Sequence, residues 1–253
     1  MNNLFTLRNV ALVASLMTFS FASLATGTTD WDFRTSGGNS YGSGSGTDSY
    51  GNTLSFNSAD TDLTITAWAD TLEQNDPDTI QTATAAHNSY GLLNYNRNND
   101  GHYVDNRDDT DMLLFTFDDL VSITGVNIGY YSNDSDISIA AFDTLPTLQG
   151  QTWATVASAA SYSASFSNLS RNWNSLASAT AGIDSKYWVI GAYNGAFGSP
   201  GWSTGNDNLK IAGISTIAGA SPKPPTSDVA EPSSLAILAS FGLFAVWRRR
   251  KSA

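Results

Sequence analysis

The chain contains no cysteine, and this absence excludes several classes of protein. No disulfide can stabilise a secreted fold, so a folded part must depend on its core, with or without a bound metal. A lipoprotein anchor and a prenyl group each require a cysteine, so neither can be attached to this chain.

Basic side chains are scarce in the middle of the chain. Residues 26–230 contain 22 aspartates and glutamates but only seven lysines and arginines, a net charge of −15. Such a surface repels phosphate backbones, which argues against nucleic-acid binding. The acidity favours a hydrated, extracellular setting with divalent cations as partners.

Histidine is almost absent, since only His87 and His102 occur. Neither lies in a His-x-x-x-His pattern, and no Gly-x-Ser-x-Gly motif occurs, so zinc and serine hydrolases lack support. Aspartate pairs are abundant, which leaves a glycosidase with two carboxylates as an open alternative. We expect His102 to form hydrogen bonds in a loop or across strands.

No apolar run approaches the length of an ordinary membrane span, but two shorter runs lie at the ends of the chain. The first follows Arg8 and extends over 10–24, ending in the small residues of Ser23-Leu24-Ala25. A basic start, an apolar centre and small residues at the cleavage positions are typical of a secretory signal peptide. We predict a signal peptide over 1–25, cleaved after Ala25 by the general secretion machinery.

The second apolar run contains 13 residues, from Leu235 to Trp247. About 20 residues usually span the hydrocarbon core, so we expect a thin crossing assisted by snorkelling side chains. Positive charge beside a span favours the cytoplasmic side, which leaves the upstream domain outside. The charges that stop the span are Arg248, Arg249, Arg250 and Lys251. Residues 218–228 contain three prolines and form a semi-stiff linker before this tail.

Residues 229–253 resemble the PEP-CTERM sorting signal of Gram-negative bacteria. Val229-Ala230-Glu231-Pro232 stands where that family has Val-Pro-Glu-Pro, followed by the apolar run and the terminal basic cluster. The resemblance implies recognition by exosortase, a membrane transpeptidase or protease. It also implies cleavage near Glu231 and Pro232, after which the mature protein is released or transferred at the cell surface.

Apolar residues alternate with polar ones throughout 26–217. The pattern is clear in 63–67, 113–117, 137–141 and 162–166, with Gly, Asn and Asp between the runs. The phase slips near Gly125, where we expect a bulge. This pattern predicts a single all-β domain, an antiparallel β-sandwich or jelly roll. We expect Trp68 and Trp188 in its core, and Trp173 and Trp202 at its surface.

The central domain resembles the XDP type of exosortase-dependent surface proteins. The similar segments are 101–106, 111–118, 133–138 and 185–194, within a region from Leu54 to Ile217. The resemblance implies a surface or matrix protein with no catalytic residues. A carbohydrate-binding module that acts on exopolysaccharide is the alternative from a different functional class.

Aspartates crowd one part of the domain. Oxygen ligands of this kind suit Ca²⁺, so a calcium site and a solvated acidic loop are both open interpretations. The candidate ligands are Asp105, Asp108, Asp109, Asp111, Asp134 and Asp136. Residues 96–107 imitate the start of an EF-hand loop, but Arg107 occupies the position of its final glutamate, which argues against that motif.

Overall fold

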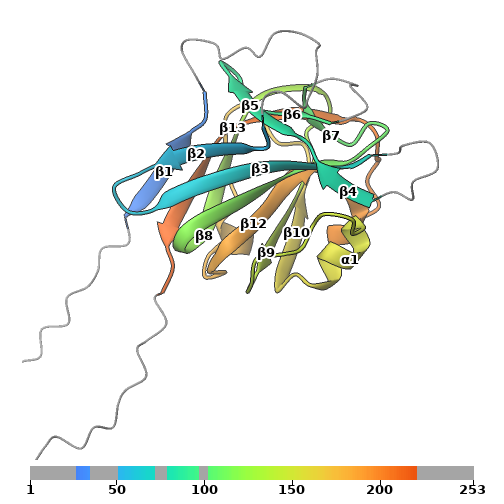
Figure 1. The fold of residues 1–253 in the computed structure, drawn as a ribbon. Coiled ribbons are helices and arrows are strands. Elements are labelled where there is room, and N and C mark those ends of the chain that lie inside the picture. Colours follow the sequence, from blue (N-terminus) through green and yellow to red (C-terminus); the bar gives the residue numbers. More distant parts are fainter. Residues whose placement is uncertain (1–26, 35–50, 72–78, 97–101, 221–253) are drawn as a thin grey trace, which may run out of the picture.

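The computed structural model describes residues 27–34, 51–71, 79–96 and 102–220 (Figure 1). The predicted signal peptide, with its cleavage residue Ala25, lies outside the described residues. So does the sorting tail, with Val229, Glu231 and Pro232 and with the basic residues Arg248, Arg249, Arg250 and Lys251. No helix among the described residues has the length and apolar character needed to cross a membrane.

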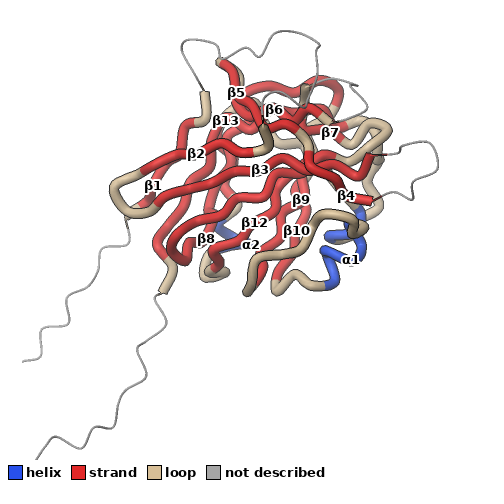
Figure 2. Tube along the Cα trace, in the orientation of Figure 1, coloured by secondary structure: helices blue, strands red, loops and turns tan. Residues whose placement is uncertain are grey.

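Strands dominate the described chain (Figure 2). Every ladder between two of them is antiparallel. The all-β prediction is therefore confirmed. The strands are β1 (Thr28–Asp32), β2 (Thr53–Asn57), β3 (Asp62–Thr71), β4 (Thr79–Thr82), β5 (Thr84–Asn88), β6 (Gly91–Tyr95), β7 (Val104–Asp105), β8 (Asp111–Asn133), β9 (Ile137–Phe142), β10 (Tyr162–Phe166), β11 (Trp173–Ser175), β12 (Ser185–Ala192) and β13 (Asp207–Ala218). Only short helices accompany them: α1 (Trp153–Ser158), α2 (Ala177–Thr180) and the 3₁₀ turn η2 (Gly195–Phe197).

The long strand β8 belongs to two layers. Its first part, up to Phe117, lies between β3 and β12, in a layer that also contains β2, β9 and β10. Its second part, from Val121, lies between β13 and β11, and β1 pairs with the far side of β13. The result is sandwich-like, as Figure 1 shows. The jelly-roll version of this fold stays a prediction.

One buried cluster fills the space between the two layers. Alternate residues along β3 and the first part of β8 meet residues from β9, β12 and β13, because alternate side chains of a strand share a face. Trp188 has no exposed surface, which confirms its predicted core position. The cluster includes Leu63, Ile65, Ala67, Leu113, Phe115, Phe117, Ile139, Trp188, Ile190, Ile211 and Ile214.

A second apolar cluster covers the outer face of the first layer. Met112 and Leu114 of β8 pack there with Trp153 and Val156 of α1. With both faces buried, the start of β8 has a continuous apolar run instead of alternation. Trp68 also packs against this outer cluster and is only half-buried, so its predicted core position is wrong. Its neighbours in β3 take the inward positions, and the pleat turns Trp68 outward.

The predicted bulge in β8 is confirmed. Gly125 pairs with Ser215 and Ile123 pairs with Thr216, so Thr124 is the extra residue on the β8 side. The apolar residues before and after the bulge have opposite phases in the sequence. Because of the extra residue, side chains from both sides, including Ile123 and Val126, lie in the same core. The carbonyl of Thr124 accepts a hydrogen bond from the backbone N–H of Leu176 at 2.8 Å, so this irregularity is tied to the segment before α2.

Strand β13 connects the two ends of the domain. It begins at Asp207, opposite Asn133, and ends at Ala218, opposite Val121. Twelve residues of strand extend over roughly 35 Å. Thr28 pairs with Ile217, so both described ends of the domain lie at the far end of β13 from Asp207 (Figure 1). Ala218, which we predicted as the first linker residue, completes this strand.

Candidate functional site

Three aspartates converge where β8 ends and where β9 and β13 begin. Asp134 follows β8, Asp136 precedes β9, and Asp207 is the first residue of β13. One carboxylate oxygen from each lies within 4.8 Å of the other two. Among the described residues this is the only group of three or more aspartate, glutamate or histidine side chains close enough to share a cation.

The backbone brings these aspartates together. Asp134 and Asp207 form an isolated parallel bridge, and the backbone N–H of Asp134 donates to the carbonyl of Asn206 at 3.1 Å. The backbone N–H of Asp136 donates to Oδ1 of Asp207 at 2.8 Å. The positions of the three carboxylates therefore depend on the pairing of β8 with β13, not on their spacing in the sequence.

Asn106 holds the deepest of the three carboxylates. Its Nδ2 donates to Oδ2 of Asp207 at 2.7 Å and to the carbonyl of Tyr193 at 2.8 Å. Its Oδ1 accepts from the backbone N–H groups of Gly205 and Asp207, both at 3.0 Å. The amide thus satisfies four polar partners, as a buried asparagine must if none is to be left without a hydrogen bond.

The two outer aspartates have their own donors. Asp136 accepts from the backbone N–H of Asn168 at 2.7 Å. Asp134 accepts from the N–H of Ser135 at 2.8 Å and from Nδ2 of Asn206 at 3.1 Å. All these donors are neutral. Among the described residues, no lysine or arginine forms an ion pair with any of the three aspartates.

Burial controls the protonation of this cluster. Asp207 has no exposed surface, and burial raises its pKa from 3.8 to about 7, with the charges of Asp136 and Asp134 adding to the rise. Hydrogen bonds from Asn106 and from the N–H of Asp136 oppose the shift. Burial also raises the pKa of Asp136. Near neutral pH the cluster can therefore hold either a proton or a cation.

The arrangement suits a hard cation better than it suits hydrolysis. Three carboxylates and nearby amide and carbonyl oxygens are the ligands that Ca²⁺ prefers. A glycosidase needs two carboxyl groups that reach both sides of a sugar bond. Asp207 is fully buried and Asp136 is only 4% exposed, so a sugar chain cannot reach both.

The structure places only two of the six predicted ligands in this cluster, Asp134 and Asp136. Asp105 lies in β7, Asp111 begins β8, and Asp109 is buried before β8. Asp108 is exposed in a left-handed turn with φ of 68°. Although these four are close in sequence, none of them belongs to the group of three. The sequence analysis missed Asp207 and Asn106, because no local motif links them to residues 134–136.

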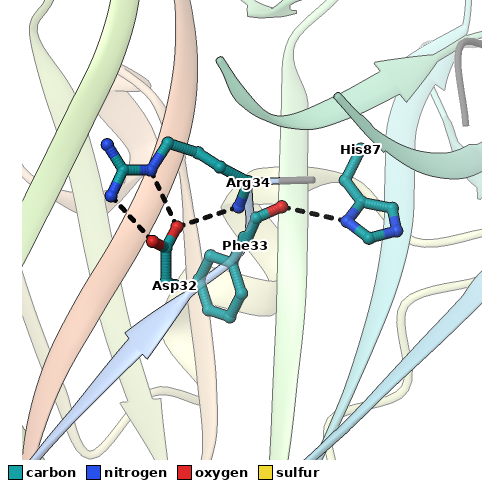
Figure 3. Close-up of polar contacts among 4 residues, drawn as sticks. All are labelled: Asp32, Phe33, Arg34 and His87. Atoms are coloured by element: carbon teal, nitrogen blue, oxygen red, sulfur yellow. Dashed lines mark hydrogen bonds and ion pairs between the residues drawn. The ribbon is translucent and has the colours of Figure 1, made fainter. Parts of the chain in front are cut away.

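The two histidines lie in different settings. Nδ1 of His87 is 2.9 Å from the carbonyl oxygen of Phe33, beside the paired side chains of Asp32 and Arg34 (Figure 3). This contact joins β5 to the residue that follows β1. The ring of His102 stacks on Tyr95 and Tyr103, so the described contacts are ring stacks where we expected hydrogen bonds.

Comparison with known proteins identifies no relative. No protein-family model, no curated protein and no solved structure matches the chain.

Proposed function

We propose that this chain is a secreted, exosortase-processed cell-surface or extracellular-matrix protein of a Gram-negative bacterium, associated with exopolysaccharide and without enzymatic activity. The observation that carries the proposal is the order of features in the tail. Glu231-Pro232, the run Leu235–Trp247 and the basic cluster follow one another at the extreme C-terminus. A signal peptide at the other end of the chain supplies the export step that such sorting requires.

The domain geometry supports this proposal. Both described ends of the domain lie together, since Thr28 pairs with Ile217. A tail that leaves from Ala218 holds the domain at that end. Asp207 begins the same strand roughly 35 Å away, so the carboxylate cluster lies at the opposite end of the domain from Ala218.

Replacing Glu231 and Pro232 together with alanine tests the sorting step. In cells that carry exosortase, we expect this variant to stay full-length and membrane-bound, while the native chain loses its tail. The matched control replaces Ser233 and Ser234, the next two residues, with alanine and should be processed normally. Release of the same truncated product from the Glu231→Ala, Pro232→Ala variant would refute the proposal.

Carbohydrate binding is the second candidate function. One observation favours it specifically: partly exposed aromatic rings from the β5–β6 hairpin, the segment before β7, and β8 gather close to Lys210 of β13. Such rings offer flat apolar surfaces for the C–H groups of sugars and hydroxyl groups for their polar edges. This function is compatible with the first, because a matrix protein has to contact the matrix.

A further inference from the structure

Five aromatic side chains form a continuous group, which we call the tyrosine face. Tyr95 stacks on His102, His102 on Tyr103 and Tyr103 on Tyr130, with ring centroids 5.8, 5.1 and 5.8 Å apart. Tyr90 meets Tyr130 edge-on at 5.6 Å. The rings come from the β5–β6 hairpin, the segment leading into β7, and β8. Both β7 and the end of β8 pair with the start of β13.

Two cations contact this face. Nζ of Lys210 lies 4.9 Å from the ring centroid of Tyr103, and 5.6 and 5.7 Å from those of Tyr90 and Tyr130. The guanidinium carbon of Arg171 lies 4.9 Å from the centroid of Tyr130. It also lies 4.8 Å from that of Tyr131, the adjacent residue in β8. Cation–π attraction at these distances holds the charges against the rings.

These cations are not neutralised by carboxylates within the described chain. Its lysines and arginines are Arg34, Arg107, Arg171, Lys186 and Lys210, and the Arg34–Asp32 contact is its only ion pair. In a chain whose residues 26–230 carry a net charge of −15, two of these five cations lie on one aromatic group. The tyrosine face is therefore a local positive site on an acidic protein.

The residues of the tyrosine face differ in how far they are exposed to solvent, and this difference indicates their roles. Tyr90, in the hairpin turn, is 50% exposed, and Arg171 is exposed as well. Tyr95, His102, Tyr103 and Tyr130 are half-buried and stacked on one another. Lys210 is only 4% exposed and lies beneath the rings. A ligand can stack on Tyr90 and pair with Arg171, while Lys210 positions the rings from below.

We propose that the tyrosine face binds an anionic polysaccharide, with a sugar ring on Tyr90 and a sugar carboxylate paired with Arg171. A pyranose combines an apolar face with hydroxyl groups, which matches rings that carry phenol groups. The planar guanidinium pairs with carboxylates through two parallel hydrogen bonds. A duplex nucleic acid carries one negative charge about every 1.7 Å along its axis, and an acidic protein with two local cations does not neutralise it.

This proposal depends on the proposed function for the setting in which the protein meets such a polymer. Lys210 lies three residues from Asp207, so the tyrosine face is at the end of β13 away from the described chain ends. Burial raises the pKa of Tyr103, and the charges of Tyr130 and Asp105 add to the rise, so one aspartate lies close to this face. Among the described residues, Asp105 forms no ion pair with Arg171 or Lys210.

Calorimetric titration of the full chain, purified in mild detergent, tests the proposal. The probes are an oligogalacturonate, a neutral oligosaccharide of the same length, and a single-stranded oligonucleotide. We expect binding of the oligogalacturonate alone, weakened about tenfold in Arg171→Gln and about fivefold or more in Tyr90→Ala. Arg171→Lys, which keeps the charge but loses the planar fork, should lie between Arg171→Gln and the native chain.

Two control variants change similar groups elsewhere. Lys186→Gln removes one positive charge from β12, and Leu145→Ala truncates an apolar residue that is 58% exposed. Both should bind the oligogalacturonate within about twofold of the native chain. Any one of four results would overturn the proposal. They are equal binding of the neutral oligosaccharide, equal weakening by Lys186→Gln and Arg171→Gln, tighter binding of the oligonucleotide, and no binding of any probe. The titration needs no tail cleavage, so its failure is distinguishable from a failure of the sorting test.

Discussion

Asp207 and Lys210 lie three residues apart on β13, both buried and opposite in charge, yet they do not pair. Between them the ladder with β8 is regular, so the odd spacing turns their side chains to opposite faces of the sheet. Asp207 meets Asn106 and two other aspartates, whereas Lys210 meets three tyrosine rings. One strand thus holds a buried negative site on one face and a buried positive site on the other.

The comparison shows two ways to bury a charge without an ion pair. Neutral donors surround Asp207, and its proton affinity rises until it is partly protonated near neutral pH. Aromatic rings surround Lys210, whose pKa falls from 10.5 to about 8 because of burial. A buried ion pair would have fixed both charges permanently. As separate sites, they respond to pH in opposite directions.

Removing the Asp207 side chain is expected to have the largest effect. Asp207→Ala leaves the Asn106 amide and the N–H of Asp136 without their acceptor in a buried site, which costs about 3–5 kcal/mol of unfolding free energy. Asp134→Ala, at the half-buried member of the same cluster, should cost less than about 1.5 kcal/mol. Urea denaturation of both variants measures the difference, and equal losses would contradict the distinction.

The pH dependence of stability should show the Asp207 effect directly. Unfolded Asp207 loses its proton near 3.8, but folded Asp207 keeps it until about 7. Rising pH through this window therefore favours the unfolded state, and stability should fall by on the order of 3 kcal/mol between pH 4 and pH 8 in EDTA. Asp207→Asn should remove most of that fall. If Asp207→Asn kept the full pH dependence of the native chain, other titratable groups would have to cause it.

Calcium should reverse this loss if the cluster binds a cation. At pH 8, where Asp207 is mostly ionised, Ca²⁺ at a hundredfold excess over its dissociation constant adds about 2.7 kcal/mol. The melting temperature should rise in millimolar CaCl₂ relative to EDTA, and the rise should shrink at pH 5 and in Asp134→Asn. Identical melts in CaCl₂ and EDTA at pH 8 would contradict calcium binding by this cluster.

Lys210→Met should have the smallest effect, and the opposite dependence on pH. Below a pH of about 8, the buried charge of Lys210 lowers the stability of the native chain, and this cost disappears as the pH approaches 10.5. The stability of the native chain should therefore increase relative to that of the variant as the pH rises. Attraction to three rings offsets part of the cost, which leaves a gain on the order of 1 kcal/mol between pH 7 and pH 9.5. A constant difference between the two proteins across this range would refute the effect.

Local patterns in the sequence were sufficient to predict the fold class. Alternation in β3 reflects one more deeply buried face, whereas both faces of β9 are buried. The phase slip before Gly125 correctly indicated a bulge. Trp173 is 46% exposed, in agreement with its polar neighbours in sequence. Trp68 was placed wrongly because a second apolar cluster covers the outer face of its layer. An apolar residue on that face cannot be distinguished, from its neighbours in sequence, from a residue of the inner core.

Both sites depend on tertiary pairing and could not be derived from spacing. Asp207 reaches Asp134 only because β13 returns beside the end of β8, more than 70 residues later. The tyrosine face likewise assembles rings from the hairpin, the segment before β7, and β8. The crowding of aspartates in 105–111 suggested a site from proximity in the chain, whereas the cluster depends on proximity in the sheet.

The mass of the mature protein, recovered from cells that carry exosortase, tests the central claim most directly. Intact mass and terminal peptides together define both ends and any attached group. The proposal predicts an N-terminus at Thr26 and a C-terminus near Glu231 and Pro232, without the four basic residues 248–251. A mature protein that still ends at Ala253 would contradict it.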